Sequence, residues 1–264
     1  MTSKRVFFVH IPKCAGTTID YMMRFQFGIA AMNVRDEPNK GGDHLRQGGN
    51  HLAFANSLHP WFRAASGHGL FLSKEIRDRY PDSFWFTILR EPRARYLSHF
   101  TYLAEKKGLQ TKLDDWVGQG NMKNIQTRWL AGEPNLDKAI EAMETLFDFV
   151  GRLDRLEDSL AMMARAAGVP FTSPTGYQRN ITKGAKPELS DSVKAMIEEN
   201  NQLDIQLWDY FCANIWPKEE AALGGAKLAT HDEITLRDRM NLGLNWFWRG
   251  AVYAPALKVR GALA

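Results

Sequence analysis

The sequence predicts an α/β fold with a central, mainly parallel sheet flanked by helices. Two short apolar runs, residues 5–10 and 83–90, have the composition of buried strands. Each run is followed by residues whose apolar side chains recur at helical spacing. Strands that alternate with helices are typical of parallel sheets, because parallel neighbours need a crossover connection.

The first strand, residues 5–10 (RVFFVH), is apolar, aromatic and β-branched. A tight loop follows it, and residues 17–27 then carry apolar side chains at helical spacing. Residues 33–50 are polar and rich in glycine, which predicts a long loop.

Residues 83–90 (SFWFTILR) form the clearest predicted strand, apolar on both faces as in the centre of a parallel sheet. Residues 91–107 predict a helix with Pro92 in its first turn and lysines near its end. Weaker patterns predict helices at 112–118, 122–131, 135–146 and 154–167, a strand at 147–152, a basic loop at 176–189 and helices from Ser190 to about Cys212.

The composition is that of a folded protein: 264 residues, 44% hydrophobic and 24% charged. We expect one main domain over residues 1–216 and a basic, aromatic helical appendage over 217–264. The two cysteines, Cys14 and Cys212, exclude a disulfide scaffold and a four-cysteine zinc site.

Charge is unevenly distributed along the chain. Of 34 basic residues, four lie from position 239 onward, where there is no acid, so the first 238 residues balance 30 bases with 30 acids. A neutral main domain argues against a nucleic-acid binder. The basic segment leaves three partners open: an anionic membrane surface, a second subunit of a homodimer, or its own domain.

The sequence shows no membrane-spanning segment, because it has no stretch of 18 apolar residues. The apolar run at its start is too short for the core of a signal peptide. We therefore expect a cytoplasmic location. Peripheral binding to the inner face of the membrane is the alternative that stays open.

The segment HIPKCAGTT, residues 10–18, suits an anion, because it lies between a strand and a helix. Lys13 adds a charge, Gly16 permits close backbone approach, and Thr17 and Thr18 add hydroxyls. It is not a Walker A loop, in which the lysine follows the second glycine. The alternative is a capped turn with a solvated lysine.

The segment LREPRARYLSHF, residues 89–100, places Arg90 at the carboxyl end of the best strand, where open α/β sheets bind ligands. Ser98 follows two helical turns later, so both side chains can reach one phosphate. The alternative is an arginine paired with Glu91 or another nearby carboxylate.

Together these segments resemble the sulfotransferases that use 3′-phosphoadenosine 5′-phosphosulfate (PAPS). The likeness is to the carbohydrate-type branch of heparan sulfate 2-O-sulfotransferase and its bacterial relatives, and it covers about residues 5–215. HIPKCAGTT is similar to the family's H-x-P-K-x-G-T-[ST] loop, although two residues, Cys14 and Ala15, separate its lysine from its glycine. REPRARYLS, 90–98, is similar to the family's R-[DE]-P-x5-S element. SGHGLF, NIQTRWLAG, VGRLDRLEDSL and RNITKG follow in the family's order.

The resemblance implies a three-layer fold like that of P-loop NTPases and metal-free, in-line sulfuryl transfer from PAPS to an acceptor hydroxyl, of a carbohydrate or glycolipid. It implies that Lys13 is catalytic and that Arg90 and Ser98 bind the 3′-phosphate. The residues implied for the 5′-phosphosulfate are Pro12, Lys13, Cys14, Ala15, Gly16, Thr17 and Thr18.

The resemblance also implies a general base, for which histidine is well matched near neutral pH. His68, in SGHGLF, matches the family position, and His51 and His59 are the alternatives. It places Gln126 and Arg128 near the nucleotide and acceptor cleft, as substrate-binding residues; the alternative for Arg128 is an arginine on a helix surface. Lys183 is implied to contact the 3′-phosphate, although only Lys183-Gly184 of the family's Arg-Lys-Gly triplet is present.

Cys14 lies beside Lys13 and a helix start, so the pKa of its thiol is expected to fall. A catalytic thiol is rejected, because Asp20 stands where a Cys-x5-Arg loop needs arginine. Two other functions stay open: a magnesium-dependent P-loop kinase or ATPase, and a non-catalytic module of the same fold that binds carbohydrate or a membrane surface.

Overall fold

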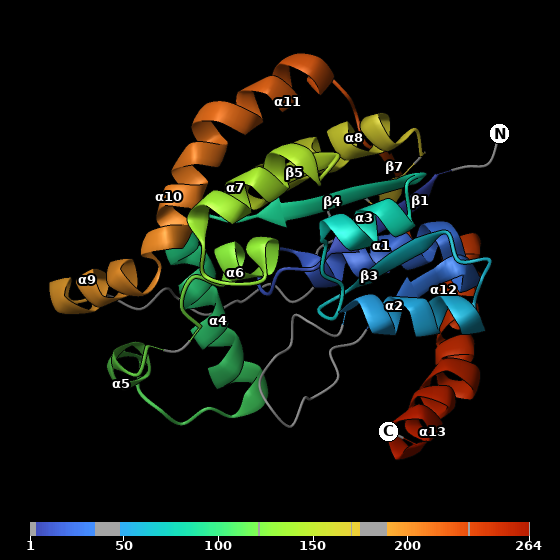
Figure 1. Ribbon diagram of the computed structural model, residues 1–264, viewed down its shortest axis with the longest axis horizontal. Helices are drawn as coiled ribbons and strands as arrows, with labels where there is room; N and C mark the ends of the chain where they lie inside the picture. The colour runs from blue at the N-terminus through green and yellow to red at the C-terminus, as the bar shows by residue number, and fades with distance from the viewer. Residues whose placement is uncertain are drawn as a thin grey trace.

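A five-stranded parallel sheet is the centre of the computed structural model, and helices flank it (Figure 1). The structure describes residues 4–34, 48–120, 122–169, 171–174, 189–231 and 233–263. The strand order is β2-β3-β1-β4-β5, and every pair in it is parallel. The strands are β1 (Arg5–Val9), β2 (Ala31–Asn33), β3 (Ala64–Gly67), β4 (Ser83–Leu89) and β5 (Phe149–Arg152).

The predicted fold class is confirmed by this sheet. All seven residues of β4 are buried, because β1 and β5 pair with its edges and other elements cover its faces. Phe7 of β1 pairs in register with Trp85 of β4, and their rings stack with centroids 4.1 Å apart. The apolar runs of β1 and β4 therefore form the middle of the core.

Helices connect the strands and line the site. The helices up to β5 are α1 (Gly16–Phe27), α2 (Gly48–Leu58), α3 (Lys74–Arg79), α4 (Pro92–Lys107), α5 (Leu113–Gly118), α6 (Ile125–Ala131) and α7 (Leu136–Thr145). The later helices are α8 (Leu156–Ala167), α9 (Asp191–Asn200), α10 (Gln202–Tyr210), α11 (Trp216–Leu223), α12 (Leu236–Trp248) and α13 (Ala254–Leu263).

Short 3-10 and π segments complete these elements: η1 (Gly28–Ala30), η2 (Leu153–Arg155), η3 (Phe211–Ile215) and η4 (Arg249–Tyr253). Strands β6 (Thr172–Pro174) and β7 (Ala229–His231) form a separate parallel pair. The predicted boundary at residue 216 falls inside the unbroken helical run of α10, η3 and α11. The two-part division of the chain stays a prediction.

The expectation of one long loop over residues 33–50 was wrong at both ends. Asn33 is the last residue of β2, and α2 begins at Gly48. Glycine pairs suggested a loop there, yet Leu52 and Ala55 of α2 are buried in the core. Strand β3 and helix α3 were also not predicted, because AASG has no apolar run and KEIRDR is short and charged.

Among the described residues, we find no helix that is both long and apolar enough to cross a membrane.

Candidate functional site

The loop between β1 and α1 has a strained backbone. Lys13 (φ 70°) and Ala15 (φ 60°) adopt the left-handed conformation, which costs a residue with a side chain about 1–2 kcal/mol. The N–H of Cys14 donates to the Ile11 carbonyl over 3.3 Å and closes the turn. The loop thereby leads directly into the positively polarised start of α1 at Gly16.

Gly16 is needed because the imidazole of His10 lies against it. A Cβ atom at Gly16 would be only 1.6 Å from His10 Nε2. The His10 ring in turn contacts the His68 ring, with centroids 3.9 Å apart. Burial, followed by the charges of His68 and Lys13, lowers the pKa of His10 well below its usual value. His10 is therefore a neutral packing partner at neutral pH.

His68 follows the end of β3 and is exposed. Its Nδ1 lies 2.9 Å from the His10 carbonyl oxygen, which can only accept, so Nδ1 carries the proton. This tautomer puts the lone pair on Nε2, the nitrogen that can act as a base.

Buried Asp20 of α1 fixes the strand end from which His68 projects. Its carboxylate accepts hydrogen bonds from Ser66 of β3, from Arg24 and from Asn33 of β2. This buried carboxylate thus connects α1 to the ends of β2 and β3. Ser66, its partner on β3, lies two residues before His68.

Lys13 is half-buried, and its Nζ lies 4.2 Å from the centre of the Tyr102 ring on α4. Burial lowers the pKa of Lys13, and the positive charge of Arg90 lowers it further. A cation that is desolvated beside another cation is suited to bind an anion.

Arg90 comes directly after β4 and reaches back to the loop after β1. Its Nη1 donates to the Lys13 carbonyl oxygen over 3.1 Å. Burial lowers the pKa of Arg90, and the charge of Arg95 adds to this effect. The two segments singled out from the sequence therefore meet at one edge of the sheet.

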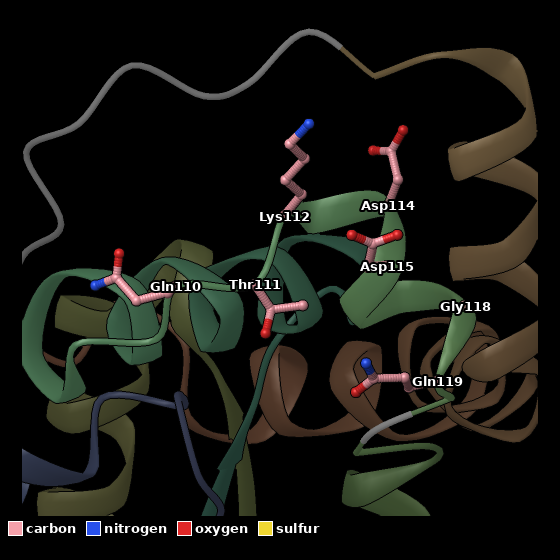
Figure 2. A pocket seen from close by; sticks show the side chains of 7 residues that line it. All are labelled: Gln110, Thr111, Lys112, Asp114, Asp115, Gly118 and Gln119. Atoms are coloured by element: carbon pink, nitrogen blue, oxygen red, sulfur yellow. The ribbon is translucent and has the colours of Figure 1, made fainter.

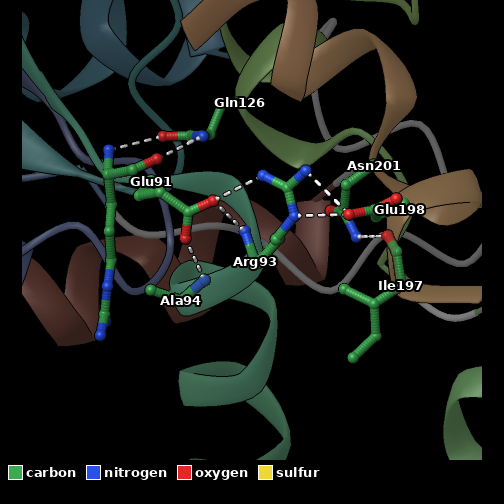
Figure 3. A network of polar contacts seen from close by, with 8 residues as sticks. Glu91, Arg93, Ala94, Gln126, Ile197, Glu198 and Asn201 are labelled. Atoms are coloured by element: carbon green, nitrogen blue, oxygen red, sulfur yellow. Dashed lines mark hydrogen bonds and ion pairs between the residues drawn. The ribbon is translucent and has the colours of Figure 1, made fainter. Parts of the chain in front are cut away.

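Glu91 holds the start of α4 in place (Figure 3). Its carboxylate accepts from the backbone N–H groups of Arg93, over 3.2 Å, and Ala94, over 2.7 Å. Arg93 also donates to Glu198 of α9 through Nε, over 3.0 Å, and Nη2, over 2.9 Å. The arginine that pairs with Glu91 is thus Arg93, whereas Arg90, for which this pairing was the alternative, donates to the Lys13 carbonyl.

Gln126 of α6 connects the loop after β1 to the residue after β4, Arg90. It is 1% exposed. Its Oε1 accepts from the Arg90 N–H over 2.8 Å, and its Nε2 donates to the Arg90 carbonyl over 2.9 Å. The Cys14 thiol also donates to Oε1, over 3.6 Å. Both polar atoms of this amide thus bond to protein groups, which makes Gln126 a positioning residue in this structure.

Buried Asp204 of α10 holds Gln126 in turn, a role that sequence reasoning missed. The residue before α6, Asn124, has a left-handed backbone and provides no side-chain cap. Asp204 takes that place, because its carboxylate accepts from Gln126 N over 3.0 Å and from Thr127 N and Oγ1 over 2.8 Å each. Its partner lies 78 residues away in sequence, so no local motif indicated it.

Arg95 is a second residue that sequence reasoning missed. Its side chain is 0% exposed, and its Nη2 donates to the Met122 carbonyl over 3.3 Å. Within the described part of the chain, Nε and Nη1 have no hydrogen-bond partner. Burial lowers its pKa, and the charge of Asp204 opposes that effect. The signal in the sequence was a third arginine, five positions after Arg90 and in the helix that follows it.

The other predicted residues are placed as follows. Ser98 is buried in α4, and Thr18 is buried in α1, whereas Pro12 and Thr17 are partly exposed. Arg128 is exposed on α6, two residues after Gln126. Lys183 lies outside the described residues.

One alternative base, His59, is not brought to this cluster. His59 is buried beside Trp61 and Trp248, with ring centroids 4.9 Å and 5.1 Å away. His51 belongs to α2, but its side chain is not among those that the structure describes. Of the two whose side chains the structure describes, His68 is the one that contacts the residue after β1, His10.

The expectation of a lowered pKa at Cys14 was wrong. The thiol is fully buried, and burial raises its pKa to about 12. The nearby charges of Arg95, Arg90 and Lys13 lower it, but their effect is smaller than that of burial. Cys14 is therefore a protonated donor to Gln126.

A pocket of about 850 Å³ lies elsewhere, around α5 (Figure 2). Its lining is polar, and none of the predicted site residues belongs to it. The lining residues are Gln110, Thr111, Lys112, Asp114, Asp115, Gly118 and Gln119.

Comparison with known proteins gives a matching family model and matching solved structures, one of which is described here. A family model described as "Sulfotransferase family" matches residues 2–211. The crystal structure of a sulfotransferase from Alicyclobacillus acidocaldarius covers 84% of this chain and 96% of that chain, at 12% identity and a TM-score of 0.44. No curated protein matches the chain. The assignment of the family rests on the first finding.

Proposed function

This chain belongs to the sulfotransferase family, and we propose that it transfers a sulfuryl group from PAPS to a hydroxyl of a carbohydrate or glycolipid. The hydrogen bond from Arg90 Nη1 to the Lys13 carbonyl carries this proposal. It joins the two segments that the resemblance assigns to the 5′-phosphosulfate and the 3′-phosphate. One bisphosphorylated nucleotide can therefore contact both.

The chemistry of the site fits such an anion. Lys13 and Arg90 are both half-buried, and burial lowers the pKa of each. A bound phosphate would offset the cost of holding these charges close together. The start of α1 adds a partial positive charge on the same side.

In the proposed reaction the acceptor oxygen bonds to sulfur while the bond from sulfur to the 5′-phosphate oxygen breaks, which releases adenosine 3′,5′-bisphosphate. His68 Nε2 takes the proton of the acceptor hydroxyl. The Lys13 ammonium stabilises the negative charge that develops on the leaving phosphate oxygen. Arg90 holds the 3′-phosphate, and Gln126 keeps the Arg90 backbone in place.

Titration calorimetry with adenosine 3′,5′-bisphosphate, without metal, tests the donor. We expect micromolar binding to the wild type and a loss of about a hundredfold in Arg90→Ala, because a buried charged hydrogen-bonding partner is removed. ATP with magnesium serves as the competing ligand.

Arg93→Ala is the matched control. This arginine lies three positions further on, is exposed and pairs with Glu91 and Glu198. It should bind the bisphosphate within about twofold of the wild type, since exposed ion pairs contribute about 0–1 kcal/mol. Binding of ATP–magnesium in place of the bisphosphate would favour a kinase. Binding of neither ligand would favour a module without transferase activity.

Gln126→Ala tests whether the amide of Gln126 positions Arg90. The substitution leaves the N–H and the carbonyl of Arg90 without partners, so we expect bisphosphate affinity to fall about tenfold with no change in net charge. The readout is the Kd from the same titration, on protein whose circular dichroism matches the wild type. Gln110→Ala, an exposed glutamine, is the control. Unchanged bisphosphate affinity in Gln126→Ala would show that the Gln126 amide does not position Arg90.

A further inference from the structure

Most of the exposed large apolar side chains of the described residues lie on one segment near the end of the chain. Phe247 is 70% exposed and Leu236 is 75% exposed. The other members on this segment are Met240, Leu244, Trp246 and Val259. A concentration of this kind marks an interaction surface, because single exposed apolar residues are normally scattered.

Helix α12 is oriented with polar side chains toward the protein. Asn245 is buried, and its Nδ2 donates to the carbonyls of Gly28, over 2.9 Å, and Ala31, over 2.7 Å. Asn241 donates to the Phe25 carbonyl over 2.6 Å. Hydrogen bonds to the backbone around the end of α1 thus hold α12, and most of its apolar residues face outward.

The outward residues form a stripe, which we define as Leu236, Met240, Leu244 and Phe247. At about 100° per residue these four positions span an arc of about 80°, and Arg237 and Arg239 lie on either side of it. Both arginines are exposed. An apolar stripe between basic side chains is typical of a helix that lies in a membrane interface.

Aromatic and basic residues continue beyond the stripe. Trp248 lies beside Trp61, with ring centroids 5.7 Å apart, and Trp61 is exposed. Helix α13 extends away from the sheet (Figure 1) and carries exposed Lys258. Tryptophan and basic side chains suit the headgroup region of a bilayer.

Charge decides between a lipid surface and a second copy of the chain. A symmetric contact through the stripe places this surface against its own copy, which again offers Arg237 and Arg239 and, from residue 239 onward, no acid. The acid between them, Asp238, is buried and already accepts from Thr235. An anionic surface supplies the missing negative charge.

We propose that the stripe of α12, with Arg237 and Arg239, binds the surface of an anionic lipid bilayer. The apolar side chains enter the boundary between headgroups and acyl chains, and the arginines contact lipid phosphates. This surface is independent of the proposed transferase activity, because it uses none of the residues placed in that site.

Flotation with vesicles tests the proposal on the full chain. The wild type should float with vesicles of phosphatidylcholine and phosphatidylglycerol, and far less with pure phosphatidylcholine. Met240→Asp/Phe247→Asp should reduce the bound fraction at least about tenfold, and Arg237→Glu/Arg239→Glu should have a similar effect.

Two matched variants serve as controls. Met240→Leu/Phe247→Leu keeps the apolar stripe and should still float. Lys74→Glu/Arg79→Glu makes the same charge change on α3 and should also float. Circular dichroism checks that every variant is folded.

The proposal is overturned if the wild type stays in the aqueous fraction, if it floats equally with neutral vesicles, or if Met240→Asp/Phe247→Asp still floats. Light scattering adds one more decisive outcome. A dimer that Met240→Asp/Phe247→Asp dissociates, in a protein that binds no vesicles, would identify the stripe as a contact between subunits.

Discussion

Replacing Lys13 by alanine is expected to lower kcat about 10²–10³-fold, the usual cost of removing one preorganised donor to a developing negative charge. The ammonium group is expected to act mainly in the transition state, when charge builds on the leaving phosphate oxygen. Binding of adenosine 3′,5′-bisphosphate should therefore weaken far less than kcat falls. Lysine and alanine carry the same penalty for the left-handed backbone at this position, so the loop is kept.

The measurement does not need the natural acceptor. Slow transfer of the sulfuryl group from PAPS to water can be followed as release of adenosine 3′,5′-bisphosphate, by ion-exchange chromatography. Lys106→Ala, an exposed lysine at the end of α4, makes the same charge change and should leave the rate unchanged. An unchanged kcat in Lys13→Ala, with only weaker binding, would remove the catalytic role of this lysine.

Replacing Asp204 by alanine is expected to lower the free energy of unfolding by about 3–5 kcal/mol. Three donors of Gln126 and Thr127 would lose their acceptor inside the protein. Buried Arg95 would also lose the negative charge that opposes its desolvation. Urea unfolding measures the change, and Asp204→Asn, which keeps one oxygen acceptor, should lose about half as much.

Asp238→Ala is the matched control, because Asp238 is also buried at a helix start. It forms a capping box with Thr235 on its own helix. The expected loss is about 1 kcal/mol, with unchanged bisphosphate affinity. Asp204→Asn should in addition weaken bisphosphate binding, since α6 carries Gln126. Equal losses in Asp204→Ala and Asp238→Ala would show that Asp204 is an ordinary cap.

The central strands could be predicted because their own residues determine them. The runs in β1 and β4 are apolar and rich in aromatic and β-branched residues, so they form strands where both faces can be covered. The strand β3 (AASG) could not be predicted. Its small residues have no strong preference, and it becomes a strand because β1 and β2 pair with it.

The places of two site residues, Lys13 and Arg90, could also be predicted from the sequence. Lys13 and Arg90 were identified from strand ends, helix starts and spacing, and the structure brings them together. Their chemical roles, and that of His68, stay predictions until the experiments above are done. The lowered thiol pKa expected for Cys14 was wrong, because a sequence displays nearby charges but not the depth of burial.

The sequence by itself determined the strand–loop–helix segments and the residues at their ends, because those depend on neighbours a few positions apart. Only the tertiary structure decided how the segments are held together. The thiol of Cys14 meets Gln126 across 112 residues, and Asp204 meets it across 78. It also decided that α12 turns its asparagines inward and its apolar stripe outward. A buried hydrogen bond needs a partner at a particular place in space, and spacing along the chain does not encode that place.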